Sequence, residues 1–151
     1  MKKSFISSFA PHDSERYYET RIYALKCCNT MLQQIITTLG RDAFNVMASW
    51  GCVSRENFLF DIVRWREMPT LAIRVSGFQH NGYALVSLNE GTDTYEVELA
   101  DENMQVDDDS VRETDVYCDE LANVIDRLVE TGDMSKEQYD AKIVESLMQG
   151  D

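Results

Sequence analysis

Apolar residues in the first third of the chain recur at helical spacing. Between residues 14 and 39 they fall in steps of three and four, the period of a helix that buries one face. Asp13 or Ser14 can cap the start of this helix, and Gly40 can take the left-handed position that follows a helix end. A shorter helix is predicted over residues 42–50. The pattern therefore indicates a pair of N-terminal helices joined by a short turn.

The period of the pattern then changes from that of a helix to that of a strand. Apolar and polar residues alternate in four runs, at residues 58–63, 71–76, 83–88 and 94–99. Turn-forming residues such as Asn81 and Gly82 separate the runs. Because parallel neighbours need a crossover of about a dozen residues or more, these short connections predict an antiparallel meander. Residues 104–106 are a candidate fifth strand.

Helical spacing returns near the C-terminus. Apolar residues over 117–129 form one stripe, and Gly132 follows its last turn. Ser135 and Gln138 have the spacing of a capping box. This box predicts a final helix whose inward side chains are Tyr139, Ile143, Val144 and Leu147.

Together these patterns predict an α+β fold. We expect an N-terminal helix pair, a four- to five-stranded antiparallel meander sheet, and one or two C-terminal helices packed on the sheet. Residues 1–151 are predicted to form a single domain, with residues 1–12 as a flexible tail.

The composition is that of an ordinary globular domain. The 151 residues are 44% hydrophobic, and no apolar run approaches the roughly 18 residues of a membrane span. The N-terminal segment is too short and too rich in serine for an export signal. The four cysteines, at positions 27, 28, 52 and 118, form no C-x-x-C pair and are expected to stay reduced. We therefore predict a cytoplasmic protein that does not bind a membrane.

Acidic residues are concentrated in one stretch. Residues 90–120 hold thirteen acidic side chains and one basic one, so they contribute 1 − 13 = −12 to a net charge of −13. Glu96 and Glu98 belong to the outward, solvated face of a predicted strand. Around a predicted helix start, where carboxylates meet the positive end of the helix dipole, lie Glu113, Asp115, Asp119 and Glu120. These positions have local reasons to be acidic.

The acids without such a reason define a candidate acidic surface. It consists of Asp101, Glu102, Asp107, Asp108 and Asp109. Clustered negative charge can steer a basic protein partner toward such a surface, and a solvated loop is the alternative. An EF-hand calcium loop is excluded, because the aspartates are contiguous and the required glycine and glutamate are missing. We expect no metal and no cofactor.

Few residues suggest catalysis. No phosphate-binding, dinucleotide-binding, zinc-protease or nucleophile-elbow motif occurs. His12 and His80 fall in the predicted tail and in a predicted turn, and Cys118 is expected to be a buried, inert thiol. We name no catalytic residue and expect a non-enzymatic role.

Four arginines gather around Trp65 in the sequence. They are Arg55, Arg64, Arg66 and Arg74, and arginine beside an aromatic ring can contact nucleic acid. A net charge of −13 opposes association with phosphates. Salt bridges to the acidic half of the chain explain these arginines better, so we expect no direct nucleic-acid partner.

Several short motifs follow one another between residues 77 and 130. They are Gly77-Phe78, Gly82-Tyr83, the stretch 90–99 (EGTDTYEVEL), the stretch 116–121 (VYCDEL) and the stretch 125–129 (IDRLV). Their order resembles small uncharacterised domains carried by bacterial mobile elements. The resemblance implies an accessory, intracellular role beside conjugation or defence functions, and it assigns no activity. Within this region we expect Tyr95 and Tyr117 to meet in the core between sheet and helix.

Three functions remain open. The leading hypothesis is a small accessory protein that binds a protein partner through the candidate acidic surface. The second is a DNA mimic or an immunity-type inhibitor of a basic nuclease. The third is an enzyme or small-ligand binder with a site between sheet and helices. Homodimerisation through an exposed strand edge is a further alternative.

Overall fold

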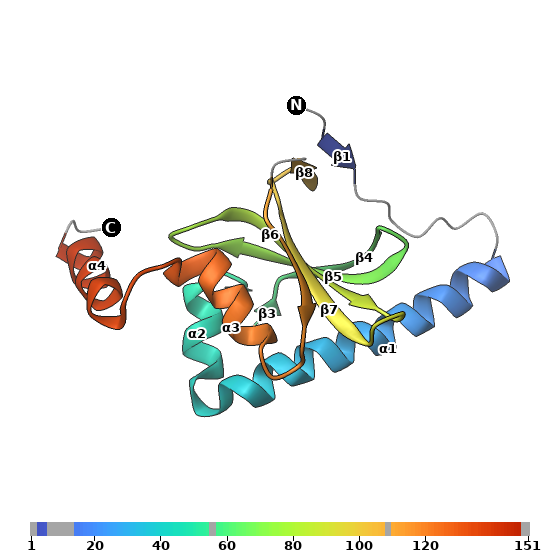
Figure 1. The fold of residues 1–151 in the computed structure, drawn as a ribbon, viewed down its shortest axis with the longest axis horizontal. Helices are drawn as coiled ribbons and strands as arrows, with labels where there is room; N and C mark the ends of the chain where they lie inside the picture. Colours follow the sequence, from blue (N-terminus) through green and yellow to red (C-terminus); the bar gives the residue numbers. More distant parts are fainter. Residues whose placement is uncertain (1–2, 6–13, 55–56, 108–109, 149–151) are drawn as a thin grey trace.

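The computed structural model describes residues 3–5, 14–54, 57–107 and 110–148. Within these residues, helices and strands follow one another in an α+β arrangement. Figure 1 shows a twisted sheet in the middle of the molecule and the longest helix passing beneath it. The predicted fold class is therefore confirmed.

The N-terminal helix pair forms as predicted. Helix α1 (Ser14–Leu39) is followed by a short 3-10 turn, η1 (Gly40–Asp42), and by α2 (Ala43–Ser49). The buried side chains of α1 recur at helical spacing and include Cys28, Met31 and Ile35. Gly40 ends α1 with a φ of +61°, a conformation that residues with a Cβ avoid.

Five antiparallel strands form the main sheet, in the order β4-β5-β6-β7-β9. Their bounds are β4 (Phe60–Trp65), β5 (Met68–Ser76), β6 (Asn81–Asn89), β7 (Thr94–Ala100) and β9 (Arg112–Val116). Strands β4 to β7 are sequential neighbours, which is the predicted meander. A small hairpin of β2 (Val53–Ser54) and β3 (Asn57–Phe58) leads from α2 into the sheet.

The fifth strand of the main sheet is not the predicted one. Residues 105–107 do form a strand, β8 (Gln105–Asp107), but it pairs with β1 (Lys3–Phe5) in a separate two-stranded sheet. Strand β1 lies inside the predicted tail, whose other residues fall outside the described ones. The fifth place in the main sheet belongs to β9.

Residues 112–116, which the sequence analysis placed around the start of a helix, form strand β9. Glu113 and Asp115 are strand residues, and only Val116 of this strand is buried. Because four of its five side chains are polar, the strand shows no alternation of apolar and polar residues. Pairing with β7, and not local pattern, defines it.

Two helices and a π-helical segment close the chain. Helix α3 (Leu121–Asp126) continues into the π-helical η2 (Arg127–Thr131). Helix α4 (Lys136–Met148) begins at the predicted capping box. The backbone N–H of Gln138 donates to the Ser135 hydroxyl at 3.2 Å, and the backbone N–H of Ser135 donates to the Gln138 side chain at 2.9 Å.

The inward face of α4 is smaller than predicted. Tyr139 and Ile143 are half-buried, whereas Val144 and Leu147 are 55% and 71% exposed. The helix lies at the side of the molecule (Figure 1), where its Tyr139 ring meets Phe78 edge to face at 6.0 Å. Only the nearest turns of α4 are therefore covered.

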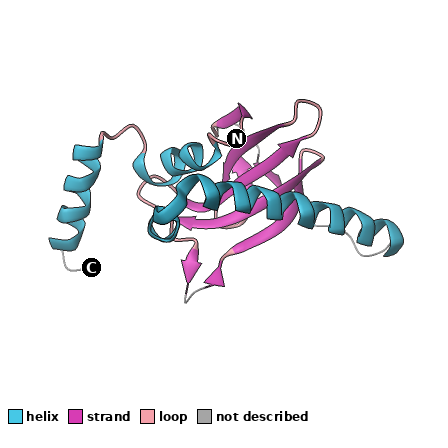
Figure 2. Ribbon diagram, turned by 90° about the horizontal axis from the view of Figure 1, so that it is seen from below, coloured by secondary structure: helices cyan, strands magenta, loops and turns pink. Residues whose placement is uncertain are grey.

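Both faces of the main sheet carry buried residues. Figure 2 shows α1 lying across the strands, and the larger core fills the space between helices and sheet. That core includes the fully buried Trp50, whose indole N–H donates to Asp126 at 2.8 Å. A smaller cluster on the other face contains Val63, Trp65, Ala72, Leu85, Ala100 and Val106. This second cluster changes the environment of the acids on β7.

Candidate functional site

The acids of β7 are buried, contrary to the expectation of a solvated strand face. Glu96 and Glu98 are each 3% exposed. Glu98 accepts hydrogen bonds from the Trp65 indole N–H and from Arg66 Nε and Nη2, the latter two at 2.9 and 3.0 Å. Because the smaller cluster covers this side of the sheet, alternation along one strand could not reveal the burial.

Glu96 is buried in the same way. It accepts hydrogen bonds from Arg112 Nε and Nη2 at 2.9 and 2.5 Å, and from the Asn89 side-chain amide at 2.9 Å. Arg112 is the one basic residue among the thirteen acids of the stretch. Because Arg112 pairs with Glu96, it does not neutralise the other acids of the stretch.

The arginines near Trp65 contact groups within the protein. Arg66 binds Glu98 and lies 4.9 Å from the centre of the Trp65 ring, and Arg74 lies 4.0 Å from Glu102. The predicted salt bridges to the acidic half are confirmed for these two arginines. Arg64 instead pairs with Glu67 at 2.7 Å, three residues further along the chain. Arg55 lies outside the described residues.

The candidate acidic surface is partly explained by local structure. The Asp101 carboxylate accepts hydrogen bonds from the backbone N–H groups of Asn103 and Gln105 at 2.9 and 3.0 Å, which closes the turn after β7. Glu102 is exposed and accepts a hydrogen bond from the Asn81 amide at 2.9 Å. A role of these two residues in binding a partner stays a prediction.

The three aspartates of the candidate acidic surface follow β8. Asp107 is the last residue of that strand and is half-buried. Asp108 and Asp109 lie outside the described residues. Any contribution of this triplet to partner binding is therefore also a prediction.

A second group of acids lies at the opposite end of the sheet. Because Tyr95 at the start of β7 pairs with Val116 at the end of β9, the β6–β7 turn and the segment after β9 share one end of the sheet. We define the acidic end as five exposed residues there: Glu90, Asp93, Asp115, Asp119 and Glu120. The length of β7 separates them from Asp101, so the thirteen acids do not form one continuous surface.

The segment between β9 and α3 turns its side chains outward. Tyr117 is 59% exposed, so it does not meet Tyr95 in the core as predicted. The Tyr95 hydroxyl instead donates to the Gln34 side chain of α1 at 2.5 Å. Cys118 is exposed, which corrects the prediction of a buried thiol. These side chains follow an edge strand and lack a covering layer.

The other residues considered for chemistry, His80, Cys28 and Cys52, are bonded or buried within the protein. The His80 ring lies 2.8 Å from the Ala100 carbonyl oxygen, and His12 lies outside the described residues. Burial raises the pKa of Cys28 and of Cys52 to about 12, so both thiols stay protonated at neutral pH. Among the described residues, no group of three or more His, Cys, Asp and Glu side chains is placed to hold a metal ion.

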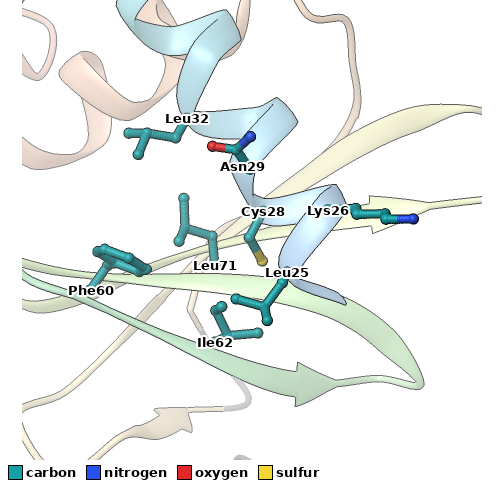
Figure 3. Close-up of a pocket in the computed structure, with 8 residues that line it drawn as sticks. All are labelled: Leu25, Lys26, Cys28, Asn29, Leu32, Phe60, Ile62 and Leu71. Carbon is teal, nitrogen blue, oxygen red and sulfur yellow. The ribbon is translucent and has the colours of Figure 1, made fainter. Parts of the chain in front are cut away.

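A groove lies between α1 and the sheet, where the third hypothesis expects a site, but none of its lining residues was singled out from the sequence. It encloses about 380 Å³ and is lined by Leu25, Lys26, Cys28, Asn29, Leu32, Phe60, Ile62 and Leu71. Figure 3 shows apolar side chains from α1, β4 and β5 converging on one space, while Lys26 extends away from it. Leu25 and Phe60 are each 43% exposed. The groove therefore presents apolar surface to solvent at the edge of the sheet.

A second hollow, of about 290 Å³, lies where η2, α4 and the β5–β6 turn meet. Its lining comprises Ser49, Ser76, Gly77, Phe78, Glu130, Tyr139 and Ile143. Glu130 is 3% exposed and accepts a hydrogen bond from the Phe78 backbone N–H at 3.2 Å. Burial raises the pKa of this carboxyl, and the hydrogen bond opposes that shift. Glu130 therefore ties the β5–β6 turn to η2.

Comparisons with family models, with curated proteins and with solved structures find no match. The resemblance to domains of mobile elements therefore stays a prediction. No helix in the described parts of the chain is long and apolar enough to cross a membrane.

Proposed function

We propose that the protein is a non-enzymatic accessory protein that binds a protein partner in the groove between α1 and β4. The observation that carries the proposal is the groove itself, which encloses about 380 Å³ and has a predominantly apolar lining. Contiguous exposed apolar surface in a soluble protein marks a contact site. The proposal keeps the function predicted from the sequence and moves the binding site from the acids to the groove.

The second hollow supports a small-ligand function less well. Its buried carboxylate, Glu130, already accepts a hydrogen bond from the protein backbone. The neighbouring ring of Phe78 contacts Tyr139 and lies 5.5 Å from the Lys142 ammonium group. These contacts give the hollow a structural explanation, in which α4 is held against the β5–β6 turn.

Two matched pairs of exposed apolar residues make the proposal testable. On α1, Leu25 lines the groove and is 43% exposed, whereas Ile36 lies outside it and is 38% exposed. Among the phenylalanines, Phe60 lines the groove and Phe44 of α2 does not, with exposures of 43% and 65%. Each pair allows the same substitution to be compared inside and outside the groove.

The experiment is selection of a displayed random heptapeptide library on the immobilised full chain, followed by affinity measurements with the synthesised peptides. Leu25→Asp and Phe60→Asp should each weaken binding by about tenfold or more, because a carboxylate would replace apolar contact area. Ile36→Asp and Phe44→Asp should leave the affinity unchanged. A selection that yields no peptide, or only peptides indifferent to the groove substitutions, refutes the proposal.

A second candidate function is recognition of a basic protein through negative charge. The observation that favours it is the acidic end, where five exposed carboxylates gather on a chain of net charge −13. A pull-down from native lysate at low salt should then recover a basic partner whose binding weakens as salt is added. Neutralising the acidic end and, separately, Asp107 to Asp109 should identify the acids involved. Binding that ignores both sets of substitutions contradicts this candidate.

The DNA-mimic alternative finds less support in the geometry. It requires two rows of exposed carboxylates at the spacing of duplex phosphates. Glu96 and Glu98 are buried, and the acidic end lies at the opposite end of the sheet from Asp101 and Glu102. A divided distribution of this kind favours contacts with a protein over mimicry of a duplex.

A further inference from the structure

We infer that the partner segment binds as an additional strand along β4, and that it is an extended apolar stretch with an acidic side chain where it passes Lys26. This inference rests on the proposed function, because it specifies what the groove holds. Addition of a strand to an exposed sheet edge is a general mode of peptide recognition, in which main-chain hydrogen bonds supply affinity and side-chain pockets supply specificity.

The outer side of β4 has the hydrogen-bonding groups that such a strand needs. The Arg74 backbone N–H donates to the Leu59 carbonyl at 3.0 Å, so this carbonyl points toward β5, whereas the Leu59 N–H donates to the Cys52 carbonyl at 2.7 Å. Because successive residues of a strand alternate in this respect, Ile62 and Arg64 direct their backbone groups away from β5. Arg64 lies opposite Pro69, which has no N–H to exchange, and this agrees with the register.

No described strand covers this side of β4. It is the first strand in the sheet order, with β5 as its one neighbour in the main sheet. Exposed edges of this kind template pairing with a further strand. The described part of the chain therefore offers an open edge at Ile62 and Arg64, directly beside the groove.

The same residues serve the edge and the groove. Ile62 lines the groove with its side chain while its backbone faces outward along the edge. A strand added beside β4 would place every second side chain on the face that α1 covers. Those side chains would lie over the space between Phe60 and Leu25. The groove therefore selects an alternating apolar pattern in an extended segment.

The charge at the groove specifies the polar residue of the segment. The Lys26 side chain starts at the wall of the groove and extends away from the apolar space, and it takes part in none of the ion pairs formed between described residues. None of the described residues that line the groove is acidic. An acidic partner residue is therefore complementary to Lys26, whereas a basic one would face it without compensation. A second copy of the chain is disfavoured as the occupant, because two chains of net charge −13 repel each other.

The experiment uses the full chain and the heptapeptides selected on it. Amide hydrogen exchange of Ile62 and Arg64 should slow by about tenfold or more at saturating peptide, because their N–H groups become bonded. The amide of Val63, which pairs with Thr70 of β5, is the internal control and should not change. Methylating the peptide nitrogens at alternate positions should abolish binding for one parity only.

Charge reversal tests the acidic residue separately. The selected peptides should contain Asp or Glu, and replacing that residue with Lys should weaken binding to the wild type by about tenfold. Lys26→Glu should invert this preference. Peptides that bind without any preference between Glu and Lys at every position contradict the part of the inference that concerns charge.

The outcomes separate this inference from the function on which it rests. Peptides that require Leu25 and Phe60 but leave Ile62 and Arg64 unprotected refute strand addition and leave the proposed function standing. Peptides that bind independently of the groove refute both. If the wild type sediments as a dimer that Leu25→Asp converts to a monomer, the occupant is a second copy and the inference is overturned.

Discussion

Replacement of Glu98 by alanine should destabilise the protein although the residue belongs to its most acidic stretch. The carboxylate is 3% exposed and accepts a hydrogen bond from Trp65, which is itself 7% exposed. Leaving the buried indole N–H without an acceptor costs about 1–3 kcal/mol. Loss of the ion pair with Arg66 adds only about 0–1 kcal/mol, because that guanidinium is 42% exposed and can be solvated.

The expected loss in the free energy of unfolding for Glu98→Ala is therefore about 1–4 kcal/mol. In a domain of this size it corresponds to a fall in Tm of about 2–16 °C. Urea and thermal unfolding followed by circular dichroism measure both quantities. Glu98→Gln keeps an acceptor for Trp65 and should lose less than half as much. Glu102→Ala, at an exposed acid, should change stability by no more than about 0.5 kcal/mol.

Two results would contradict this account of Glu98. If Glu98→Ala is no more destabilising than Glu102→Ala, the carboxylate is not a structural acceptor. If Glu98→Gln is as damaging as Glu98→Ala, the charge matters more than the hydrogen bond to the indole. The comparison therefore tests the assignment of the energy as well as its size.

Three further substitutions test other parts of the fold. Burial raises the pKa of Glu130, so its contribution to stability is fully present below its unfolded pKa and is lost as pH rises through its folded pKa. Glu130→Gln should therefore raise the Tm at pH 7 and flatten the dependence of Tm on pH, and a lower Tm at pH 7 would contradict this. A Cβ on Gly77 would lie 2.3 Å from the Val129 carbonyl oxygen, so Gly77→Ala should cost about 1–3 kcal/mol in urea unfolding, and a neutral effect would show that the two backbones can separate. Ser135→Ala removes the N-cap of α4 and should weaken that helix by about 1 kcal/mol, measured by faster amide exchange confined to α4; faster exchange in the main sheet would contradict such a local effect.

Features that depend on neighbours in sequence were predictable. The apolar spacing that predicts α1 and the pair formed by Ser135 and Gln138 involve residues three or four apart, the distance at which helical side chains meet. Of the apolar stripe predicted for α1, Cys28 and Ile35 are buried, whereas Ile22 and Leu25 are 52% and 43% exposed. The four strands of the meander also follow from local alternation and from turn residues. The sequence signal that predicts each of these elements therefore lies within a few neighbouring residues.

Features that depend on distant contacts were not predictable. Strand β9 is polar and exists because it pairs with β7, and Glu98 is buried because Trp65, 33 residues earlier, lies over it. The groove combines Leu25 of α1 with Phe60 of β4, two residues whose apolar character is equally typical of a core. No local pattern separates such residues from core residues, because only tertiary structure shows which of them stay exposed.

The response to salt should distinguish the two candidate functions. The groove has an apolar lining, and Lys26 is the one basic residue among its described lining residues. Binding of an extended segment there therefore draws mainly on apolar contact and backbone hydrogen bonds, which added salt does not screen. The acidic end acts at a distance, and the Debye length falls from about 10 Å at 0.1 M salt to about 3 Å at 1 M.

Raising the salt concentration should therefore leave the affinity of a groove-bound peptide within about threefold, while a partner held by the acidic end should dissociate. Titrations at two salt concentrations, with Leu25→Asp and a variant neutralised at the acidic end as controls, measure this difference. A peptide that needs Leu25 and is nevertheless released by salt would show that charge, and not apolar contact, dominates binding in the groove.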